Sequence, residues 1–338
     1  MTADQSIMRN VRKRPTSSTG VQAQWSDPRP GGQISWERLD QLLANAREME
    51  ERDPWTAETV GYAGRCFVQA NLPHSIRNID PIKPYTRENG KYSLQIKPDA
   101  KYGMPYGSIP RLILIWVADE VRRTKNPLLF LGDNLSKFMS DLDMVPTGGR
   151  WGTVTRLRNQ MLRLFNADIR FSSADKDGAQ GRLLAFQKYD LWWNRPTDAR
   201  QSDLWRSEIL LTTPLFEELL VHSHPVDMRV IKALRRSPME LDVYCWLTAR
   251  MYSLNRPLFL AYETLRAQFG SHYGDPYSFK LNLDKALWSV RKQYPAVRVE
   301  ANVRDERGKD GWRLHPSPTS VPKDKRPLIA GPSPRLEL

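Results

Sequence analysis

The sequence of 338 residues contains no long hydrophobic run and almost no cysteine. Its longest apolar stretch, LILIWVA at 112–118, is far shorter than the roughly 20 residues that a helix needs to cross a bilayer. Only Cys66 and Cys245 are present, far apart in the chain, so neither a disulfide framework nor a zinc cluster of closely spaced ligands is indicated. The phosphate-binding Walker A motif is also missing. We therefore expect no membrane span, no metal, no cofactor and no intrinsic ATP hydrolysis.

Positive charge, by contrast, is in excess. The chain has 51 Lys and Arg residues against 38 Asp and Glu residues, a formal net charge of +13. Forty per cent of its residues are apolar and 11 are tryptophan, which is enough to build a hydrophobic core. The charge surplus favours a polyanionic partner such as nucleic acid, although it says nothing about the fold.

The two ends of the chain differ in texture from its middle. Residues 1–33 are rich in Ser, Thr, Pro, Gly and basic residues, which predicts a disordered basic tail. Residues 35–53 carry apolar side chains at helical spacing and predict an amphipathic helix. In YTRENGKYSLQI at 85–96, the Asn89-Gly90 pair favours a hairpin turn. The segment from Pro316 onward holds six prolines and is expected to be extended and loose.

An internal repeat lies between these ends. Residues 115–139 and 245–269 share one frame of apolar positions, with Trp116 aligned to Trp246 and Pro127 to Pro257. Further along, Leu157, Met161 and Leu164 align with Leu283, Leu287 and Val290. Conservation of apolar spacing at low identity indicates two copies of one architecture.

Each copy reads as three helices followed by two strands. In the second copy, Ser237 to Glu240 has the pattern of a capping box with proline at the first helical position. Strands are expected at 167–173 and 181–193 in the first copy, and within 296–315 in the second. Three helices and a hairpin make a winged helix-turn-helix. We predict an α+β protein with two such domains in tandem, at 34–206 and 207–318, followed by a Pro-rich tail at 319–338.

The third helix of the first copy has an unusual charge pattern. Residues 150–166 contain four arginines and no acidic residue. A helical wheel places Leu157 and Met161 on the core side and Arg156, Asn159, Gln160 and Arg163 on the other. Arginine forks read guanine, side-chain amides read adenine, and unopposed charge favours phosphate. A solvated surface helix is the alternative, but such helices usually alternate Glu with Lys.

The third helix of the second copy is less clear, because its outward side mixes cations with Leu281 and Trp288. Its hairpin carries both signs of charge, which on many proteins serves only solubility. Trp192, Trp193 and Trp205 suggest a base-stacking platform, but packing between domains explains them more simply. The predicted DNA-binding residues are Arg150, Thr155, Arg156, Asn159, Gln160 and Arg163 in the first copy, and Tyr277, Ser278, Lys280, Lys285, Arg291, Lys292, Arg304, Arg307 and Lys309 in the second.

Two other classes of protein are compatible with parts of this pattern. A winged-helix transcriptional repressor shares every feature above, and only the symmetry of its binding site would distinguish it. His222-Ser223-His224 is superficially similar to the two-histidine metal motif of rolling-circle nicking enzymes. That motif needs an apolar middle residue, however, and the stretch PLFEELLVHSHPVD has the pattern of a helix end. We therefore expect a protein that is not an enzyme and has no catalytic residue.

Several sequence blocks resemble the plasmid-encoded replication initiators of the RepA type. They include YGSIPRLILIWVADEVRRT, GGRWGTVTRLRNQMLRLF and PVDMRVIKALRRSPMELDVYCWLTARM, and the resemblance covers most of residues 66–318. It implies a bacterial cytoplasmic protein that binds directly repeated origin sites, helps to open the origin, controls copy number and recruits the host initiator and replicative helicase. It also implies dimerisation with autorepression, for which the helix at 35–50 and the first domain's hairpin are the candidate interfaces.

Overall fold

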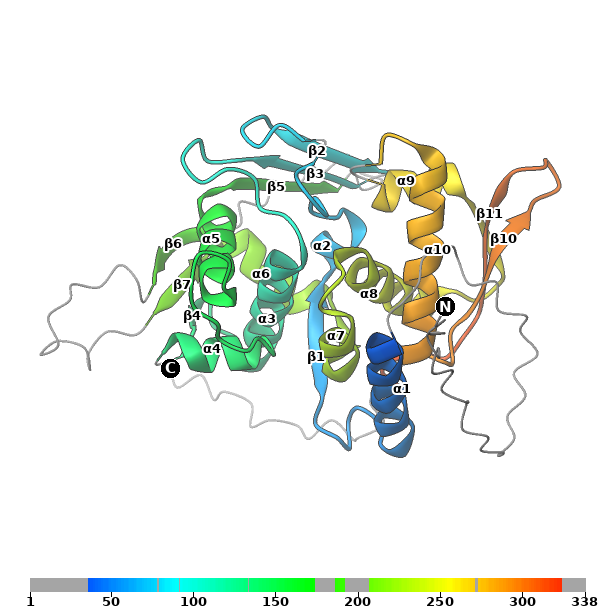
Figure 1. The fold of residues 1–338 in the computed structure, drawn as a ribbon, viewed down its shortest axis with the longest axis horizontal. Helices are drawn as coiled ribbons and strands as arrows, with labels where there is room; N and C mark the ends of the chain where they lie inside the picture. The colour runs from blue at the N-terminus through cyan, green and yellow to red at the C-terminus, as the bar shows by residue number, and fades with distance from the viewer. Residues whose placement is uncertain are drawn as a thin grey trace, which may run out of the picture.

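The computed structural model describes residues 36–77, 79–90, 92–132, 134–173, 186–191, 207–270 and 273–323. Helices and small sheets alternate along these residues, so the fold is of the α+β class, as predicted (Figure 1). The basic segment 1–33 and the three tryptophans at 192, 193 and 205 lie outside the described residues. Within the described ranges, no helix is both long and apolar enough to span a membrane.

The N-terminal part begins with the amphipathic helix that the sequence predicts. Its elements are α1 (Trp36–Glu51), β1 (Val60–Gly64), α2 (Arg65–Gln69), β2 (Tyr85–Asn89) and β3 (Tyr92–Lys97). The predicted hairpin is confirmed, since β2 and β3 pair antiparallel and Gly90 turns between them with φ of 59°. Glycine suits this turn because left-handed φ is strained for other residues.

The first copy of the repeat contains the three expected helices. Its elements are α3 (Ser108–Thr124), β4 (Leu128–Phe130), α4 (Leu135–Asp141), α5 (Thr153–Asn166), β5 (Asp168–Ser173), β6 (Phe186–Asp190) and β7 (Glu208–Leu211). The predicted hairpin between 167–173 and 181–193 is wrong, however. Strand β5 pairs with β3, while β6 pairs with β7. The cause is packing: Leu94 and Ile96 of β3 lie opposite Phe171 and Ile169 of β5, and all four side chains are buried.

The second copy contains the three predicted helices and the predicted hairpin, together with further short elements. Its elements are α6 (Thr213–His222), β8 (Ser223–Asp227), α7 (Met228–Leu234), α8 (Pro238–Ser253), β9 (Leu258–Ala261), α9 (Tyr262–Phe269), α10 (Pro276–Gln293), β10 (Arg298–Arg304) and β11 (Asp310–His315). The Ser237 hydroxyl accepts a hydrogen bond from the Glu240 amide at 3.3 Å, as the capping pattern predicts. Strands β10 and β11 form a hairpin, and β11 also pairs with β9.

The two copies share the order of their helices. Helices α3, α4 and α5 match α8, α9 and α10, and the aligned residues Leu157 and Leu283 are both fully buried. In each copy the short strand after the first helix pairs with the last strand, β4 with β7 and β9 with β11. This pairing places β7 in the sheet of the first copy, although the predicted boundary at residues 206 and 207 assigns it to the second.

A buried ion network joins the first helices of the two copies. Arg111 of α3 donates from Nε and Nη2 to the two carboxylate oxygens of Asp242 on α8, each at 2.7 Å. His74 lies 2.8 Å from the same carboxylate. Burial opposes the charge on Asp242, but Arg111 and the His74 hydrogen bond outweigh it and lower the pKa of the carboxyl. The two copies are therefore joined by a buried ion network as well as by one hydrophobic core.

The segment after β11 is anchored rather than loose. Val321 is buried, the Tyr244 hydroxyl lies 2.8 Å from Ser320 Oγ, and Trp55 Nε1 donates to the Pro322 carbonyl at 2.8 Å. The expectation of a loose tail from Pro316 is therefore wrong as far as Lys323. Aromatic hydroxyl and indole groups supply hydrogen-bond partners that the proline-rich backbone cannot find in a sheet.

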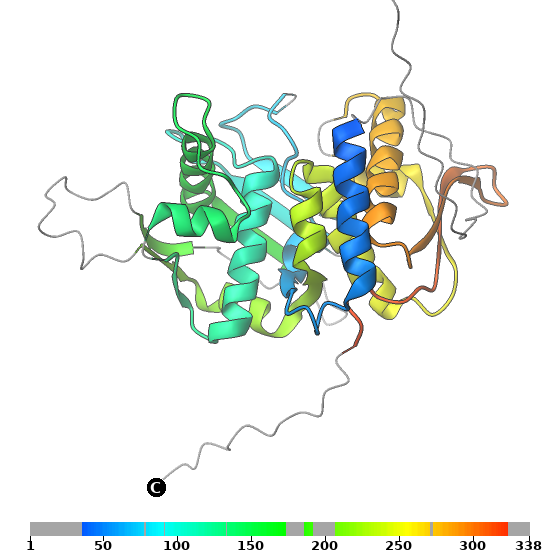
Figure 2. The same cartoon turned by 60° about the horizontal axis from the view of Figure 1, so that its bottom comes forward.

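Helix α1 packs against other helices of the same chain. Its Leu42 is fully buried, and the Leu42 carbonyl accepts a hydrogen bond from Gln293 of α10 at 2.7 Å. Arg38 donates to the Ala233 carbonyl of α7 and to Glu240 on α8. In Figures 1 and 2, α1 lies alongside α7 and α10. Part of the apolar side that made this helix a candidate dimer interface is thus covered within the chain, while Leu43 is 43% exposed.

Candidate nucleic-acid interface

A compact loop with an exposed tryptophan precedes α5. Thr147 and Thr153 bond reciprocally, each amide donating to the other residue's hydroxyl, at 2.8 and 2.9 Å. Gly152 is the N-cap residue directly before α5, and a Cβ there would lie 2.2 Å from the Thr147 carbonyl oxygen, so no larger residue fits. Thr155, a predicted contact, instead donates its hydroxyl to the Gly149 carbonyl at 2.9 Å and serves the loop.

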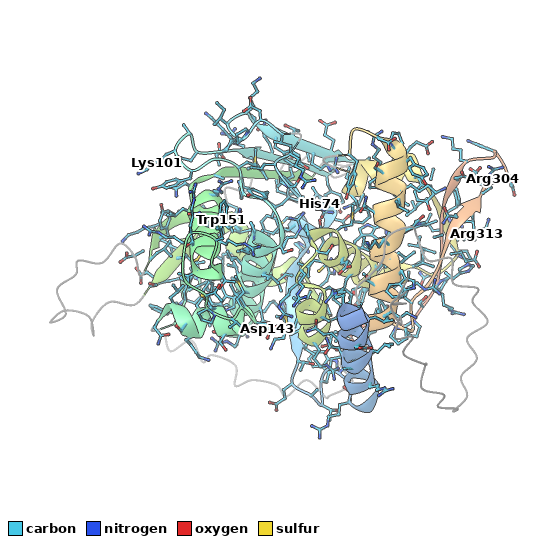
Figure 3. The ribbon with its side chains drawn as sticks, in the orientation of Figure 1. His74, Lys101, Asp143, Trp151, Arg304 and Arg313 are labelled. Carbon is cyan, nitrogen blue, oxygen red and sulfur yellow. The ribbon has the colours of Figure 1, made fainter. Side chains whose placement is uncertain are left out.

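The loop presents Arg150 and Trp151 together. Trp151 is 81% exposed, and the Arg150 guanidinium lies 5.3 Å from the centre of its ring (Figure 3). An indole in water exposes a large apolar surface that a partner can cover. Arg150 was predicted from its charge, whereas Trp151 was missed. The available signal was a bulky aromatic residue between glycines, directly before a basic helix.

Helix α5 exposes part of its predicted polar side. Arg156 and Asn159 are exposed, while Leu157, Met161 and Leu164 are buried as the helical wheel predicts. Arg158 is exposed too. Backbone amides at the beginning of the helix, together with these arginines, provide donors and positive charge for an anionic partner.

Two of the predicted DNA-binding residues on α5 point toward the protein instead of toward solvent. Gln160 is only 8% exposed, and its Oε1 accepts a hydrogen bond from the Tyr106 amide at 3.1 Å. Arg163 is half-buried, donates to the Met104 carbonyl at 3.1 Å and lies 5.2 Å from the centre of the Tyr106 ring. The prediction that Gln160 faces outward is therefore wrong, and Arg163 binds mainly to other parts of the protein. Both side chains fix the segment that leads into α3.

The beginning of α10 is open to solvent. Asp275 caps it, accepting from the amides of Tyr277 and Ser278 at 3.1 and 2.8 Å. The Ser278 hydroxyl donates to the same carboxylate at 2.7 Å, and these bonds lower the pKa of Asp275. Tyr277 is 72% exposed and Ser278 is exposed. The predicted contacts at 277 and 278 thus lie on the surface, at the end of the helix where an anion is favoured.

The remainder of α10 is less accessible than predicted. Lys285, Arg291 and Lys292 are half-buried, as are Leu281 and Trp288. Lys285 acts electrostatically on Glu240, and Lys292 lies 5.2 Å from the centre of the Trp288 ring. A helical wheel does not include the other helices that pack against α10, which are α1, α7, α8 and α9. DNA contact by these three half-buried cations stays a prediction.

The cations near the second hairpin are partly neutralised. Lys280 lies 3.8 Å from Asp310 and 4.8 Å from the centre of the Tyr262 ring, and Arg304 Nε lies 2.8 Å from Asp310. The turn is held by Asp305, which accepts from the amides of Arg307 and Lys309 at 3.0 and 2.7 Å. The side chains of Arg307 and Lys309 are exposed at its tip (Figure 3 shows Arg304 nearby).

The histidines of the suspected nicking motif lie on two different elements. His222 is the last residue of α6, as the sequence pattern predicts, and His224 is in β8, paired with Ala63 of β1. Within the described residues, no group of three or more His, Cys, Asp or Glu side chains is placed to hold a metal ion.

Residues 104–262 match the family described as "Plasmid encoded RepA protein". Over this region the chain is similar to the RepA family. The matched region extends from the segment fixed by Gln160 and Arg163 to the first residue of α9, and is narrower than the blocks recognised at 66–318. It includes α5 and its loop but ends before α10 and the second hairpin. The matched region thus contains the more exposed of the two cationic helices.

Among solved structures, the crystal structure of domains 2 and 3 of RctB is similar to this chain. The alignment covers 74% of this chain and 96% of that one, with 10% sequence identity and a TM-score of 0.44. No curated protein matches the chain.

Proposed function

We propose that this protein initiates plasmid replication in the bacterial cytoplasm by binding directly repeated origin sites through two winged-helix modules. The observation that carries the proposal is the exposed start of α5, where Arg150, Trp151, Arg156 and Asn159 lie together with no acid in the helix. Such a surface offers forked donors for guanine, an amide for adenine and positive charge for phosphate.

The order of elements in the second copy supports the winged-helix assignment. A helix, a short strand, two further helices and a hairpin follow one another, and the short strand pairs with the last strand of the hairpin. The first copy has the same order of helices, with β6 and β7 in place of the hairpin strands. In this arrangement the third helix enters the major groove with its N-terminal residues foremost.

The relative position of the two helices supports binding by a single chain. In Figure 2 the N-terminal ends of α5 and α10 both lie along the upper edge of the molecule. Two modules that read one face of a duplex contact major grooves about 34–36 Å apart, so one chain suffices for an asymmetric site of about 20 base pairs. Direct repeats of such a site do not require a symmetric dimer.

The proposal extends to partners and to the absence of catalysis. The surfaces that do not face DNA would contact the host initiator and the replicative helicase, and a homodimer would serve autorepression. We propose no catalytic role for His222 or His224, because the two side chains belong to different elements.

Selection of bound fragments from random duplex DNA, followed by footprinting, tests the proposal. We expect an asymmetric site of about two major-groove half-sites, present as direct repeats in the origin. A single inverted repeat would instead indicate a transcriptional repressor. Metal-dependent nicking of supercoiled DNA that is lost on substituting both histidines would indicate the nicking enzyme.

A further inference from the structure

A second site lies in a cavity of about 630 Å³ between the two copies of the repeat. Its walls come from β1, α3, α6, β8, α8 and the anchored segment 319–323. The side chains that matter below are Tyr62, Arg122, His224, Thr248, Tyr252 and Lys323. We propose that this cavity binds a nucleoside phosphate.

Two cations flank the cavity, each on an aromatic ring. The Arg122 guanidinium lies 4.8 Å from the centre of the Tyr62 ring, and Lys323 Nζ lies 5.0 Å from the centre of the Tyr252 ring. Arg122 donates one N–H to the Leu220 carbonyl, and a guanidinium has five such donors. Among the described residues, no carboxylate lines the cavity. Arg65, which also lines it, is paired with Glu218 behind it.

Two buried polar atoms of the lining have no partner among the described residues. Thr248 is 3% exposed, and its Oγ1 makes no hydrogen bond; the same holds for His224 Nε2. Buried polar atoms are nearly always paired, and leaving one unpaired costs about 1–3 kcal/mol. A hydroxyl and an imidazole without partners, beside two cations, indicate a polar occupant.

The electrostatics of His224 agree with an anionic occupant. Burial lowers the pKa of His224, and the positive charge of Arg65 and the proximity of His222 lower it further. The same positive field that disfavours a proton on the imidazole favours a negative group in the cavity.

The volume of the cavity and its lining residues indicate which class of anion it binds. Pockets for small molecules measure roughly 300–1,000 Å³, so this one accommodates a single nucleotide but not a duplex. Charge-assisted hydrogen bonds from Arg122 and Lys323 suit phosphate oxygens, and Tyr62, Tyr252 and Trp55 offer aromatic surface for a base. Because no Walker A loop is present, the ligand is bound without being hydrolysed by that machinery.

Isothermal titration of the full chain with ATP and GTP tests the proposal, with adenosine and inorganic tripolyphosphate as partial ligands. We expect one nucleotide per chain, bound more tightly than either partial ligand. Arg122→Gln is expected to weaken binding about tenfold or more, the effect of a lost charge-assisted bond. Thr248→Val, which fills the same volume without the hydroxyl, is expected to weaken it less.

Arg123→Gln is the matched control, since Arg123 is the next residue, is exposed and pairs with Glu120. Its nucleotide affinity should equal that of the unmodified chain, and thermal melts of all variants should show that they fold. Equal affinities in Arg122→Gln and Arg123→Gln would overturn the proposal. So would an absence of heat with both nucleotides at millimolar concentration, or tripolyphosphate binding as tightly as ATP. Loss of nucleotide affinity with unchanged origin binding separates this site from the DNA interface.

Discussion

Single residues decide whether α5 reads bases. Arg156 is exposed on the helix, one position from the buried Leu157, and has no acidic neighbour on its own helix. Arg156→Ala is expected to cost about 1–3 kcal/mol of binding free energy and to relax the base preference at one position, if the guanidinium reads a guanine. Gel-shift titration against the selected site and its single-base variants measures both quantities.

Gln160→Ala is the control for that measurement. Gln160 holds the Tyr106 amide inside the protein, so its loss should lower the melting temperature and leave the base preference unchanged. An unchanged affinity and base preference in Arg156→Ala would remove this arginine from the interface.

A second residue tests the electrostatics of the interior. Burial raises the pKa of Asp119 on α3 to about 6, with a smaller contribution from Glu120. A carboxyl with a raised pKa destabilises the folded protein once it is ionised. This destabilisation is absent below the unfolded pKa near 4, and it develops as pH rises from there through about 6. Asp119→Asn should therefore stabilise the protein by about 1–3 kcal/mol at pH 7, and by much less at pH 4.5.

Thermal melts at the two pH values check this sign. Asp141→Asn provides the comparison, because Asp141 is exposed and, among the described residues, pairs with Lys137 one turn away, at 3.3 Å. We expect that variant to change little at either pH. A gain from Asp119→Asn that is larger at pH 4.5 than at pH 7 would contradict the assignment.

At the scale of elements, one carboxylate connects the second hairpin to α10. Asp284 accepts hydrogen bonds from the Tyr262 hydroxyl and from Trp312 Nε1, all at 2.8 Å, and from Asn302 at 3.2 Å. Trp312 is fully buried. Asp284→Ala leaves its indole N–H without an acceptor, and each such loss costs about 1–3 kcal/mol.

We therefore expect Asp284→Ala to lower the free energy of unfolding by about 2–4 kcal/mol in urea titrations. The hairpin should also lose its fixed position, so that DNA affinity falls without a change in base preference. Asp284→Asn retains an acceptor and should have a smaller effect on both. Equal unfolding curves for Asp284→Ala and the unmodified protein would show that the hairpin is held by other contacts.

The sequence predicts elements better than it predicts their partners. Periodic apolar residues locate α1, α3, α5, α8 and α10, because burial of one helical side leaves a pattern of local spacing. The choice of strand partner leaves no such pattern in the sequence. The alternation of β5 is equally compatible with pairing to β3 and with a hairpin to the next strand. The pairing with β3 is set by the contact of Leu94 and Ile96 with Phe171 and Ile169.

The same reasoning explains the successes and errors at the candidate interface. A helical wheel separates Arg156 and Asn159 from the core because both depend on α5 alone. It misplaces Gln160, since the Tyr106 segment that buries this side chain lies distant in sequence. It also overestimates the exposure of Lys285 and Lys292, which are half-buried: Lys285 acts on Glu240 of another helix, and Lys292 lies over the Trp288 ring.

At the scale of the whole molecule, the two copies are held in one orientation. Strand β1 pairs with β8, and the Arg111–Asp242 pair joins α3 to α8 inside the protein. The cavity proposed for a nucleotide lies at the same junction, with Arg122 on α3 and Thr248 on α8. A ligand there contacts both copies at once, so it would favour the relative orientation that makes the best contacts.

A rigid junction between the two copies has a testable consequence for how the protein covers its DNA site. If α5 and α10 dock together, a change in one module should affect only the half-site that this module covers, about one helical turn from the other. Arg156→Ala and Tyr277→Ala form a matched pair, because both side chains are exposed and neither carries a core contact of its helix. In hydroxyl-radical footprints, each variant should lose protection in a different half of the same repeat. Loss of the same half in both variants would mean that α5 and α10 do not read separate grooves, and that the second module contributes to something other than origin recognition.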